Sequence, residues 1–432
     1  MTDTTSRPRL ATHVAVRRYL RREGSEAVVS LHDEQAGRVA CVGDREWAVL
    51  RAADGTRDVA GIVAAARREG HAVAAATVEA FLSQLEAAGM LAAGPSAPPA
   101  ASPSAGRREA MAFPDFALRC DGRGTCCRIY PTIAMAPTEA CRARGLNPDL
   151  VLTPERGSED LPWQASTPTL VEGRCPLLDE AGRCTLHASG GLDHKPHGCG
   201  RFPHHFVDDG VSLRAAVAPE CACVFVSDGA AAAPERVPLD PRDHVTRVPT
   251  TVALTADRAV DGAAYRRFAG ALEQARAAAE RAAEDPLGWL VEQARRLDDD
   301  ARPLAHHAAV GELATALERC VATQGFRAEA DFGLAVPRWM GAALARYTKA
   351  GSSQGEARPY DEWLFLRAWL FGHGPALAGA PIAFALRRAG LTVAIARALP
   401  ACVEADHPLA TDPALGWPLA LVAAATRAWS LW

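Results

Sequence analysis

Residues 175–206 read CPLLDEAGRCTLHASGGLDHKPHGCGRFPHHF, and the organisation of the middle of the chain depends on this stretch. Cys175 and Cys184 enclose PLLDEAGR, which predicts a hairpin with its turn at residues 180–182. Such a hairpin could bring the two thiols together. Cys199 follows fifteen residues after Cys184, inside HKPHGCGRFPHHF. Short loops that each carry one or two cysteines are typical of segments that a metal holds together.

The cysteines on either side extend the same pattern. Nine of the twelve cysteines of the chain lie between Cys120 and Cys223. Cys120 precedes the adjacent cysteines Cys126 and Cys127. The glycines at 122 and 124 allow a tight turn between Cys120 and this pair. Thiolates are the preferred protein ligands of zinc and of iron–sulfur clusters, and a site needs about four ligands. Because adjacent cysteines rarely serve one tetrahedral ion together, the pair favours a polynuclear site.

The competing interpretation is a cysteine-rich or disulfide-rich loop region without metal. The N-terminus, MTDTTSRPRL, lacks the apolar core of a secretory signal, so we expect a cytoplasmic, reducing compartment in which disulfides are disfavoured. The histidines of the region could each complete a site, with His197 the best placed, although most are expected in loops or around the ligands. These histidines are His187, His194, His197, His204 and His205.

Other reactive residues have less specific signals. Cys41, Cys320 and Cys402 sit in apolar patterns and are expected to be small buried hydrophobes. Glu139 could act as a general acid or base, but a helix-surface position is the simpler interpretation. Cys141 lies in a helical stretch, EACRARG, and is left out of the candidate set.

The bulk properties describe an ordinary globular protein. The chain has 432 residues, 49% of them hydrophobic and 23% charged, with a formal net charge of −4. This length predicts two to four domains, and the charge gives no indication of nucleic-acid binding. Only Lys195 and Lys349 are lysines among 47 basic residues, which we attribute to mutational bias. No apolar run is long enough to predict a membrane span.

We predict an α+β, multi-domain protein. The stretch GPSAPPAASPSAGRR at 94–108 cannot pack a core and indicates a linker. The expected parts are a small winged-helix-like domain at 1–93, a linker at 94–110, a loop-rich cysteine-cluster domain at 111–250 and a mainly α-helical region at 251–432.

The first 93 residues predict two short strands followed by three helices. Val28, Val29 and Leu31 form one β-prone run, and 39–42 forms the other. Apolar residues at helical spacing then predict three helices, which Asp44, Thr56 and Thr77 can cap and of which Gly89 ends the last.

The region after residue 250 shows helical stripes. One face joins Tyr265, Phe268, Leu272 and Ala275, and a second joins Trp339, Met340, Ala343 and Leu344. DEWLFLRAWLF at 361–371 is apolar nearly all round and predicts a buried helix. Pro381 and Gly390 are expected to bracket another helix.

The N-terminal part resembles the PqqD-like domains, which recognise leader peptides in peptide-modification pathways. The resemblance rests on DREWAVLRAADGTRDVAGIV and VEAFLSQLEAAGML and covers nearly all of the first 93 residues. It implies that an edge strand and the adjoining helix hold an extended peptide by strand addition. The alternatives are a DNA-binding winged helix, given basic residues such as Arg17 and Arg18, and a structural adaptor.

The central segment, about 113–225, resembles the YkgJ-type cysteine-cluster domain, a zinc- or iron-chelating family related to flagellin lysine-N-methylases. The order Cys…CysCys, CPLLDEAGRCTLH and GCGRFPHHF carries the resemblance. It implies as metal ligands Cys120, Cys126, Cys127, Cys175, Cys184 and Cys199, with Cys221 and Cys223 matching later cysteines less firmly. Arg123 and Gly200 depart from the family pattern, so the standard ligand set is in doubt.

These resemblances imply a protein- or peptide-modifying enzyme that transfers a methyl group from S-adenosylmethionine to a lysine. The N-terminal domain would capture the substrate chain. No nucleotide-binding loop stands out, so the sequence does not locate a cofactor site. The alternatives are a non-catalytic zinc or iron–sulfur protein that carries electrons or presents a peptide to a partner enzyme, and a metal-sensing DNA-binding regulator.

Overall fold

The computed structural model describes most of the chain in two compact units, each built from two segments. The first unit comprises 1–103 and 131–177, and the second comprises 104–130 and 178–432. The described residues are 7–11, 14–20, 27–33, 38–53, 55–93, 109–118, 120, 127, 135–150, 152–155, 165–168, 170–171, 175–227, 235–240, 242–298, 302–323, 332–350, 357–407, 410 and 413–428.

A four-stranded sheet forms the centre of the first unit. β2 (Val14–Leu20), β3 (Ala27–Asp33) and β4 (Arg38–Val42) make an antiparallel meander, which includes the two predicted strands. Val29 and Leu31 are fully buried, as expected for alternate positions on one face of a strand. β9 (Leu170–Val171) joins the edge of β2 in parallel, so the sheet order is β4-β3-β2-β9.

Three helices follow the meander, as the sequence predicts: α1 (Asp44–Ala52), α2 (Val59–Arg68) and α3 (Ala75–Ala87). The predicted caps are wrong, because the N-cap residues are Gly43, Asp58 and Ala74 in place of Asp44, Thr56 and Thr77. Asp58 lies directly before α2, so its carboxylate can accept the Gly61 N–H at 2.8 Å.

The end of α3 agrees with the sequence. Gly89 has φ +71°, and the Met90 N–H donates to the Leu85 carbonyl at 2.8 Å, which closes the helix. The chain then enters β5 (Leu91–Ala93), which pairs antiparallel with β1 (Pro8–Leu10). The unit is completed by α5 (Pro137–Leu146) and by the antiparallel pair β7 (Leu152–Glu155) and β8 (Ala165–Pro168).

Glu139 lies on α5 and does not take the surface position that the sequence favoured. Its side chain is 9% exposed, and its Oε2 accepts the Ala136 N–H at 2.8 Å. Because the first N–H groups of a helix lack partners within the helix, a glutamate in the first turn is well placed to satisfy one of them. Glu139 therefore stabilises the start of α5.

A five-stranded mixed sheet belongs to the second unit. Its order is β12-β6-β11-β10-β13, with β6–β11 and β10–β13 parallel and the other two pairs antiparallel. The strands are β6 (Glu109–Ala112), β10 (His204–Asp208), β11 (Leu213–Val217), β12 (Arg236–Pro238) and β13 (Val245–Arg247). A small hairpin, β14 (Thr251–Ala253) with β15 (Ala259–Asp261), leads into the helices.

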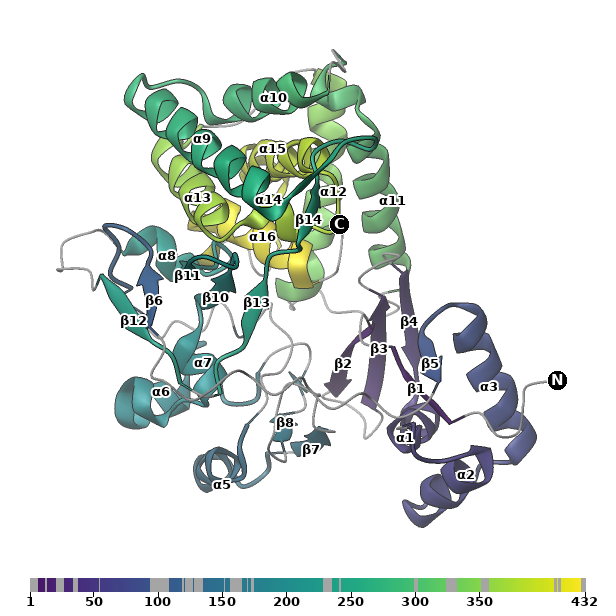
Figure 1. Cartoon of the computed structure of the whole chain (residues 1–432). Coiled ribbons are helices and arrows are strands. Elements are labelled where there is room, and N and C mark those ends of the chain that lie inside the picture. The colour runs from purple at the N-terminus through teal and green to yellow at the C-terminus, as the bar shows by residue number, and fades with distance from the viewer. Residues whose placement is uncertain are drawn as a thin grey trace. The chain divides into compact units, whose positions relative to one another are not determined.

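The remainder of the second unit is helical, which confirms the mixed α+β class with mostly helical structure (Figure 1). The stripes predicted on α9 and α12 are buried or packed against the core, and α13 is buried nearly all round. The longer helices are α9 (Gly262–Arg281), α10 (Pro286–Leu297), α11 (Ala308–Thr323), α12 (Phe332–Ala350), α13 (Pro359–Phe371), α15 (Ile382–Ala398) and α16 (Pro418–Ala428), and α14 (Gly374–Leu377) is a single turn.

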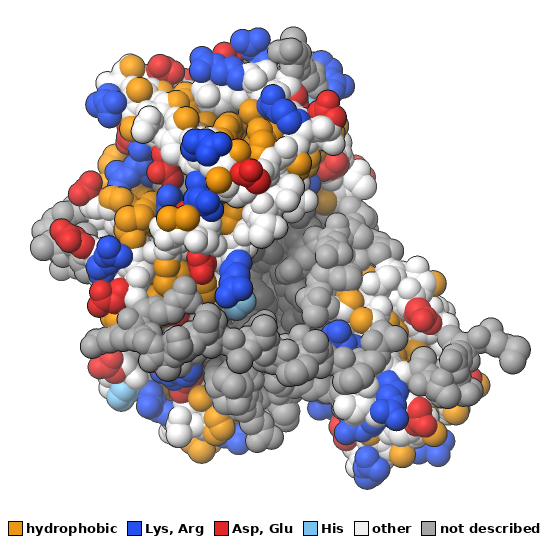
Figure 2. All heavy atoms as spheres, in the orientation of Figure 1, with side chains coloured by type: hydrophobic (Ala, Val, Ile, Leu, Met, Phe, Trp, Pro, Cys, Tyr) orange, Lys and Arg blue, Asp and Glu red, His pale blue; other side chains and the backbone are white. Residues whose placement is uncertain are grey.

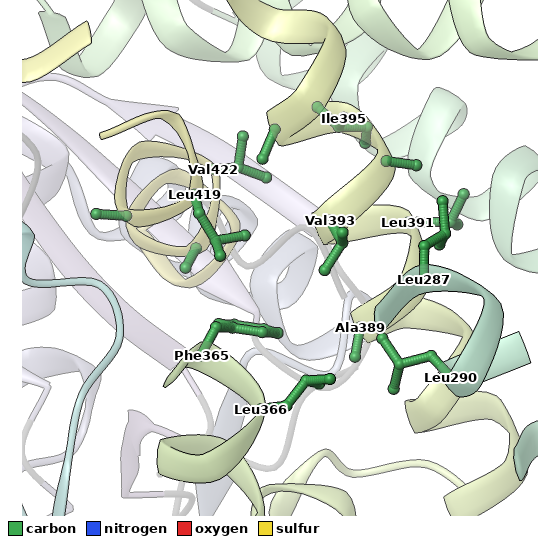
Figure 3. Packing of buried hydrophobic residues seen from close by; sticks show 14 of the residues in the cluster. Leu287, Leu290, Phe365, Leu366, Ala389, Leu391, Val393, Ile395, Leu419 and Val422 are labelled. Atoms are coloured by element: carbon green, nitrogen blue, oxygen red, sulfur yellow. The ribbon is translucent and has the colours of Figure 1, made fainter. Parts of the chain in front are cut away.

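α15 is the innermost helix of the second unit. It packs against α10, α11, α12 and α16, and nearly all of its residues are buried. Figure 3 shows Leu287 and Leu290 of α10 beside Ala389 and Leu391 of α15, with Leu419 and Val422 of α16 nearby. A helix that is apolar all round is expected to be buried on all sides.

Gly390 does not end a helix, contrary to the sequence-based expectation, because α15 continues eight residues beyond it. A Cβ atom at this position would lie 3.1 Å from Leu304 Cδ2 and 3.5 Å from Leu287 Cδ1. The glycine therefore leaves room for Leu304, of the 3₁₀ turn Leu304–His306, to pack against α15, and this contact offsets the cost of glycine inside a helix.

A buried polar cluster joins the sheet of the second unit to its helices. Tyr265 Oη lies 3.0 Å from His373 Nδ1, and His373 Nε2 lies 3.3 Å from Asp209 Oδ2. His373 is 1% exposed, and burial lowers its pKa to about 4, with a further contribution from the nearby Arg214 guanidinium. The imidazole is consequently neutral at pH 7.

The surface of the second unit carries both signs of charge. Figure 2 shows basic and acidic side chains interspersed with apolar ones over its helical part. Among the helices of the described residues, none is both long enough and apolar enough to cross a membrane.

Substitution of Gly390 tests the close packing of Leu304 against α15. We expect Gly390→Val to lower the free energy of unfolding by about 1–3 kcal/mol, because the added methyl groups overpack the contact. Gly270→Ala is the matched control, since Gly270 lies in α9 and a Cβ atom added there would have no heavy atom within 4 Å. The control should raise stability by about 0.5–1 kcal/mol through helix propensity. Urea unfolding measures both, and an unchanged Gly390→Val midpoint would contradict the packing.

The neutral state of His373 predicts a loss of stability in acid. Its pKa is about 4 in the folded chain and 6.5 in the ordinary state, so the unfolded chain binds the proton more readily. Stability is therefore complete above pH 6.5 and falls as the pH drops toward 4. Tryptophan fluorescence measures unfolding mainly of the second unit, because of the nine tryptophans only Trp47 and Trp163 lie in the first unit. The urea midpoint of His373→Gln should fall less between pH 7 and pH 5 than that of the wild type.

Candidate functional site

The turn between Cys175 and Cys184 forms where the sequence predicts it. Leu178 and Cys184 make an antiparallel bridge, and the Asp179 N–H donates to the Arg183 carbonyl at 2.9 Å. Asp179 Oδ1 accepts the Arg183 N–H at 2.8 Å, and this hydrogen bond is the main reason that the pKa of Asp179 lies below its ordinary value. Gly182 supplies the left-handed residue of the turn, with φ +75°.

Cys184 is the residue that begins the next group of short helices. It is the N-cap of α6 (Thr185–Gly190), which leads through a 3₁₀ turn (Gly191–His194) into α7 (His197–Arg201). Leu186 anchors α6 with 2% exposure. Ser189 Oγ lies 2.9 Å from His194 Nδ1, and the His194 ring occupies the space where a side chain on Gly190 would stand.

Asp243 holds α7 in place from the loop between β12 and β13. Its side chain is 2% exposed and accepts hydrogen bonds from His197 Nε2 at 2.8 Å, from Arg201 Nε at 2.9 Å and from the Asp240 N–H at 2.8 Å. Burial opposes ionisation of Asp243, but the donors, Arg201 foremost, outweigh it and lower the pKa of the carboxyl. Arg201 also donates to the Pro238 carbonyl at 2.6 Å.

This clamp fixes both ends of the short helix that carries Cys199. His197 and Arg201 flank the cysteine by two residues on each side, and both are tied to one buried carboxylate. Cys199 is half-buried. A five-residue helix has little stability of its own, so its position depends on these side-chain bonds.

Lys195 brings the first cysteine of the set to the same region. Its Nζ donates to Cys120 Sγ at 3.4 Å across 75 residues of sequence. Lys195 stands four residues before Cys199, so Cys120 lies beside the segment that leads into α7.

Cys221 and Cys223 belong to a different environment. Cys221 is the N-cap of α8 (Ala222–Val226), is 5% exposed and is a member of the large apolar core that includes Val224 and Phe225. Cys223 is half-buried against the same core. Both thiols therefore pack as small apolar groups in the second unit.

The other expected ligands are less completely placed. Cys126 lies outside the described residues, and Cys127 is a half-buried helical residue. Cys175 belongs to the first unit. So does the exposed Cys141, which is not one of the expected metal ligands. The nine cysteines with described side chains are thiols and not disulfides. Of the cysteines expected to be hydrophobic, Cys402 packs against the core and burial raises its pKa, whereas the side chains of Cys41 and Cys320 lie outside the described set.

No group of three or more Cys, His, Asp or Glu side chains is arranged to hold a metal ion within the described parts of the chain. The described donors alone do not complete a site, so the ligand set of eight cysteines stays a prediction.

Two histidines of this region each have a ring nitrogen that makes no hydrogen bond to the described residues. His187 Nδ1 and His204 Nδ1 are both buried and have no hydrogen-bond partner among the described residues. Burial, together with the nearby Arg201, lowers the pKa of His204 to about 4.

Sequence reasoning missed Asp243 and Lys195. Asp243 is 42 residues from Arg201 and stands in DPRDH, which contains several charged residues and no periodic pattern. Lys195 had one usable signal, since it is one of only two lysines in a chain that otherwise uses arginine. A guanidinium is larger and planar, whereas an ammonium is a compact donor, which suits contact with a single sulfur.

Comparison of the chain with models of known protein families, with curated proteins and with solved structures finds no match. The chemistry of the site therefore rests on its own residues.

Asp243→Asn tests the clamp on α7. The amide cannot serve both Arg201 and His197 as a charged acceptor, so we expect a loss of about 1.5–3 kcal/mol of local stability. Alkylation of Cys199 by iodoacetamide, followed by peptide mass spectrometry, should become several-fold faster. Asp406→Asn is the control, because Asp406 is exposed. Equal Cys199 alkylation rates in wild type and Asp243→Asn would show that the clamp does not position the thiol.

Proposed function

We propose that the chain binds a metal ion or an iron–sulfur cluster through thiolates of its central segment and acts in the modification of proteins or peptides. The main support is the meeting of Cys120 with the segment that carries Cys199, through Lys195. These are two of the expected ligands, and they come from positions 79 residues apart in sequence. The described cysteines are not paired in disulfides, and metal binding requires reduced cysteines.

The other expected ligands divide into two groups. Cys184 stands at the start of α6 in the same unit as Cys120 and Cys199, so these three thiols are the best supported. Cys221 and Cys223 are the least supported, because they contact apolar side chains of the helical core. A bound metal would supply folding energy to the short helices, and an iron–sulfur cluster would also supply one-electron transfer. Because the described donors do not complete the site, no reaction step is assigned to it.

We propose further that the N-terminal part captures an extended peptide, as the resemblance to PqqD-like domains implies. The three-strand meander followed by α1, α2 and α3 suits this role. β9 occupies part of the edge of β2, over Tyr19 and Leu20. β4 ends the sheet order of the described strands, and α1 contacts it, so β4 is the edge to which we assign the peptide.

A lysine N-methyltransferase-like activity that uses S-adenosylmethionine is the enzyme that the resemblance of the central segment implies. The alternative is a zinc or iron–sulfur accessory protein that presents the peptide to a partner enzyme. The anchoring of α7 by Asp243 is compatible with both, because it fixes the position of Cys199 and contributes no reactive group.

Metal analysis of protein purified without oxygen tests the proposal. We expect stoichiometric metal in the wild type, and loss of at least half of it in Cys199→Ser and in Cys184→Ser, because each removes a thiolate ligand. Cys141→Ser is the control, since Cys141 is exposed on α5 of the first unit. Iron with acid-labile sulfide would favour the enzyme, and colourless zinc would favour the accessory protein. Absence of metal from fresh anaerobic wild type would overturn the proposal.

A further inference from the structure

Lys195 and Cys120 bring an amine and a thiol together in the folded chain. Lys195 Nζ donates to Cys120 Sγ at 3.4 Å, and both residues are half-buried in the second unit. The two residues are 75 positions apart in sequence, so the contact depends on the tertiary structure. It places two groups side by side that can be joined covalently under oxidising conditions.

The backbone around Lys195 is held on both sides. Its N–H donates to the Leu192 carbonyl at 3.1 Å, at the end of the 3₁₀ turn. The next residue, Pro196, is buried and is the N-cap of α7, which Asp243 holds in place. Because the backbone is fixed, only the torsions of the lysine side chain have to be restricted to keep Nζ beside the sulfur.

The residue type at position 195 is unusual for this chain. Lys195 and Lys349 are the only lysines among 47 basic residues, and Lys349 is exposed on α12. An arginine at position 195 would also supply a positive charge and hydrogen-bond donors, but a guanidinium stays protonated and does not act as a nucleophile. An amine can lose its proton and form a covalent bond. Lys195 therefore supplies a reactive nitrogen that an arginine would not.

The thiol of Cys120 can start the reaction. The described cysteines are not paired in disulfides. Hydrogen peroxide oxidises a thiol to a sulfenic acid, which a neighbouring thiol or nitrogen can then capture. An oxygen atom between Lys195 Nζ and Cys120 Sγ would fill most of the 3.4 Å that separates them. A bridge through oxygen therefore needs little movement of either residue, whereas a direct nitrogen–sulfur bond needs more.

We propose that Lys195 and Cys120 form a redox switch, in which hydrogen peroxide joins the two side chains through one oxygen atom as an N–O–S bridge. The S–H bond and one N–H bond of the neutral amine break, and an S–O bond and an N–O bond form. The two side chains together lose four electrons. Two molecules of peroxide accept these electrons, supply the bridging oxygen and leave as three molecules of water, and the proton that the ammonium loses goes to solvent.

The bridge would take Cys120 out of the expected metal ligands, so an oxidised chain could not use this cysteine to bind a metal. Thiols would reverse the reaction, because four electrons return the amine, the thiol and one molecule of water. The consequence for metal binding rests on the proposed function. Formation of the bridge does not, since it needs only the contact between the two side chains.

Mass spectrometry of the full-length chain tests the bridge. The chain as purified, and a second sample from which a chelator has removed any metal, are treated with hydrogen peroxide, and the remaining thiols are alkylated before digestion. We expect a linked pair of peptides that contain Cys120 and Lys195. Its mass should be the sum of the two peptides plus one oxygen atom and minus two hydrogen atoms, and dithiothreitol should separate the pair. The yield should fall by roughly ten-fold or more when peroxide is added in urea, because unfolding removes the proximity of the two groups.

Variants assign the link to Lys195. Lys195→Arg keeps the positive charge and should abolish the linked pair, whereas Lys349→Arg is the matched control and should leave its yield unchanged. Thermal unfolding checks that both variants are folded. Absence of the linked pair from both wild-type samples, a link that lacks the oxygen atom, or an equal yield in urea would overturn the proposal. Formation of the link in a chain that binds no metal would overturn the proposed function and leave this inference standing.

Discussion

Burial of α15 on all sides is the constraint on which the second unit depends. A helix in this position can contain a charged residue only if the charge is paired, because an unpaired buried charge costs several kcal/mol. Arg397 meets the requirement through Glu362 of α13 and Asp285 of α10, and Arg387 meets it through Asp298 after α10. The pairs fix α10 and α13 around α15, and Gly390 leaves room for Leu304 to pack against it.

The same rule operates where the sheet meets the helices. Arg214 of β11 donates to Glu273 of α9 at 2.8 Å and to the Phe371 carbonyl at 3.2 Å, and its guanidinium lies over the Phe371 ring. Arg266 of α9 donates to the Asp209 carbonyl at 2.8 Å. Together with the Tyr265–His373–Asp209 cluster, these bonds attach the β10–β11 hairpin to α9, to the end of α13 and to the start of α14. Arg214, Arg266, Tyr265 and Asp209 thereby each contact a polar group on another element, which specifies how the elements dock.

The cysteine segment follows a different principle, because its helices are too short to be stable alone. Local turns build the path from Cys184 to Arg201, and single long-range bonds then hold it. Asp243 anchors α7, and Lys195 connects to Cys120. In contrast, Cys221 and Cys223 are held by ordinary apolar packing. Cysteines that are close in sequence pattern therefore occupy two chemical environments, one polar and one apolar.

The sequence by itself determined the features that arise within a few residues. The turn at 179–183, the stop of α3 at Gly89 and the buried face of α9 all agree with its turn chemistry and periodicity. These features could be predicted because they depend only on neighbouring residues: glycine favours a positive φ, and apolar residues spaced three and four apart form one face of a helix. The helix N-caps were harder, because α1 and α3 begin after Gly43 and Ala74, which make no side-chain cap hydrogen bond and leave no signal in the sequence.

Tertiary structure alone decided the rest. Asp243 and Arg201 are 42 residues apart, and Arg397 and Asp285 are 112 apart, so no periodic pattern connects them. Gly390 looks like a helix end in sequence, and only the approach of Leu287 and Leu304 shows why a glycine is needed inside α15. The strand β9 joins β2 from 151 residues away, with Tyr19 opposite Leu170. Such contacts depend on which surfaces meet in space, and local sequence holds no information about that because the energy of the contact exists only once both elements are in place.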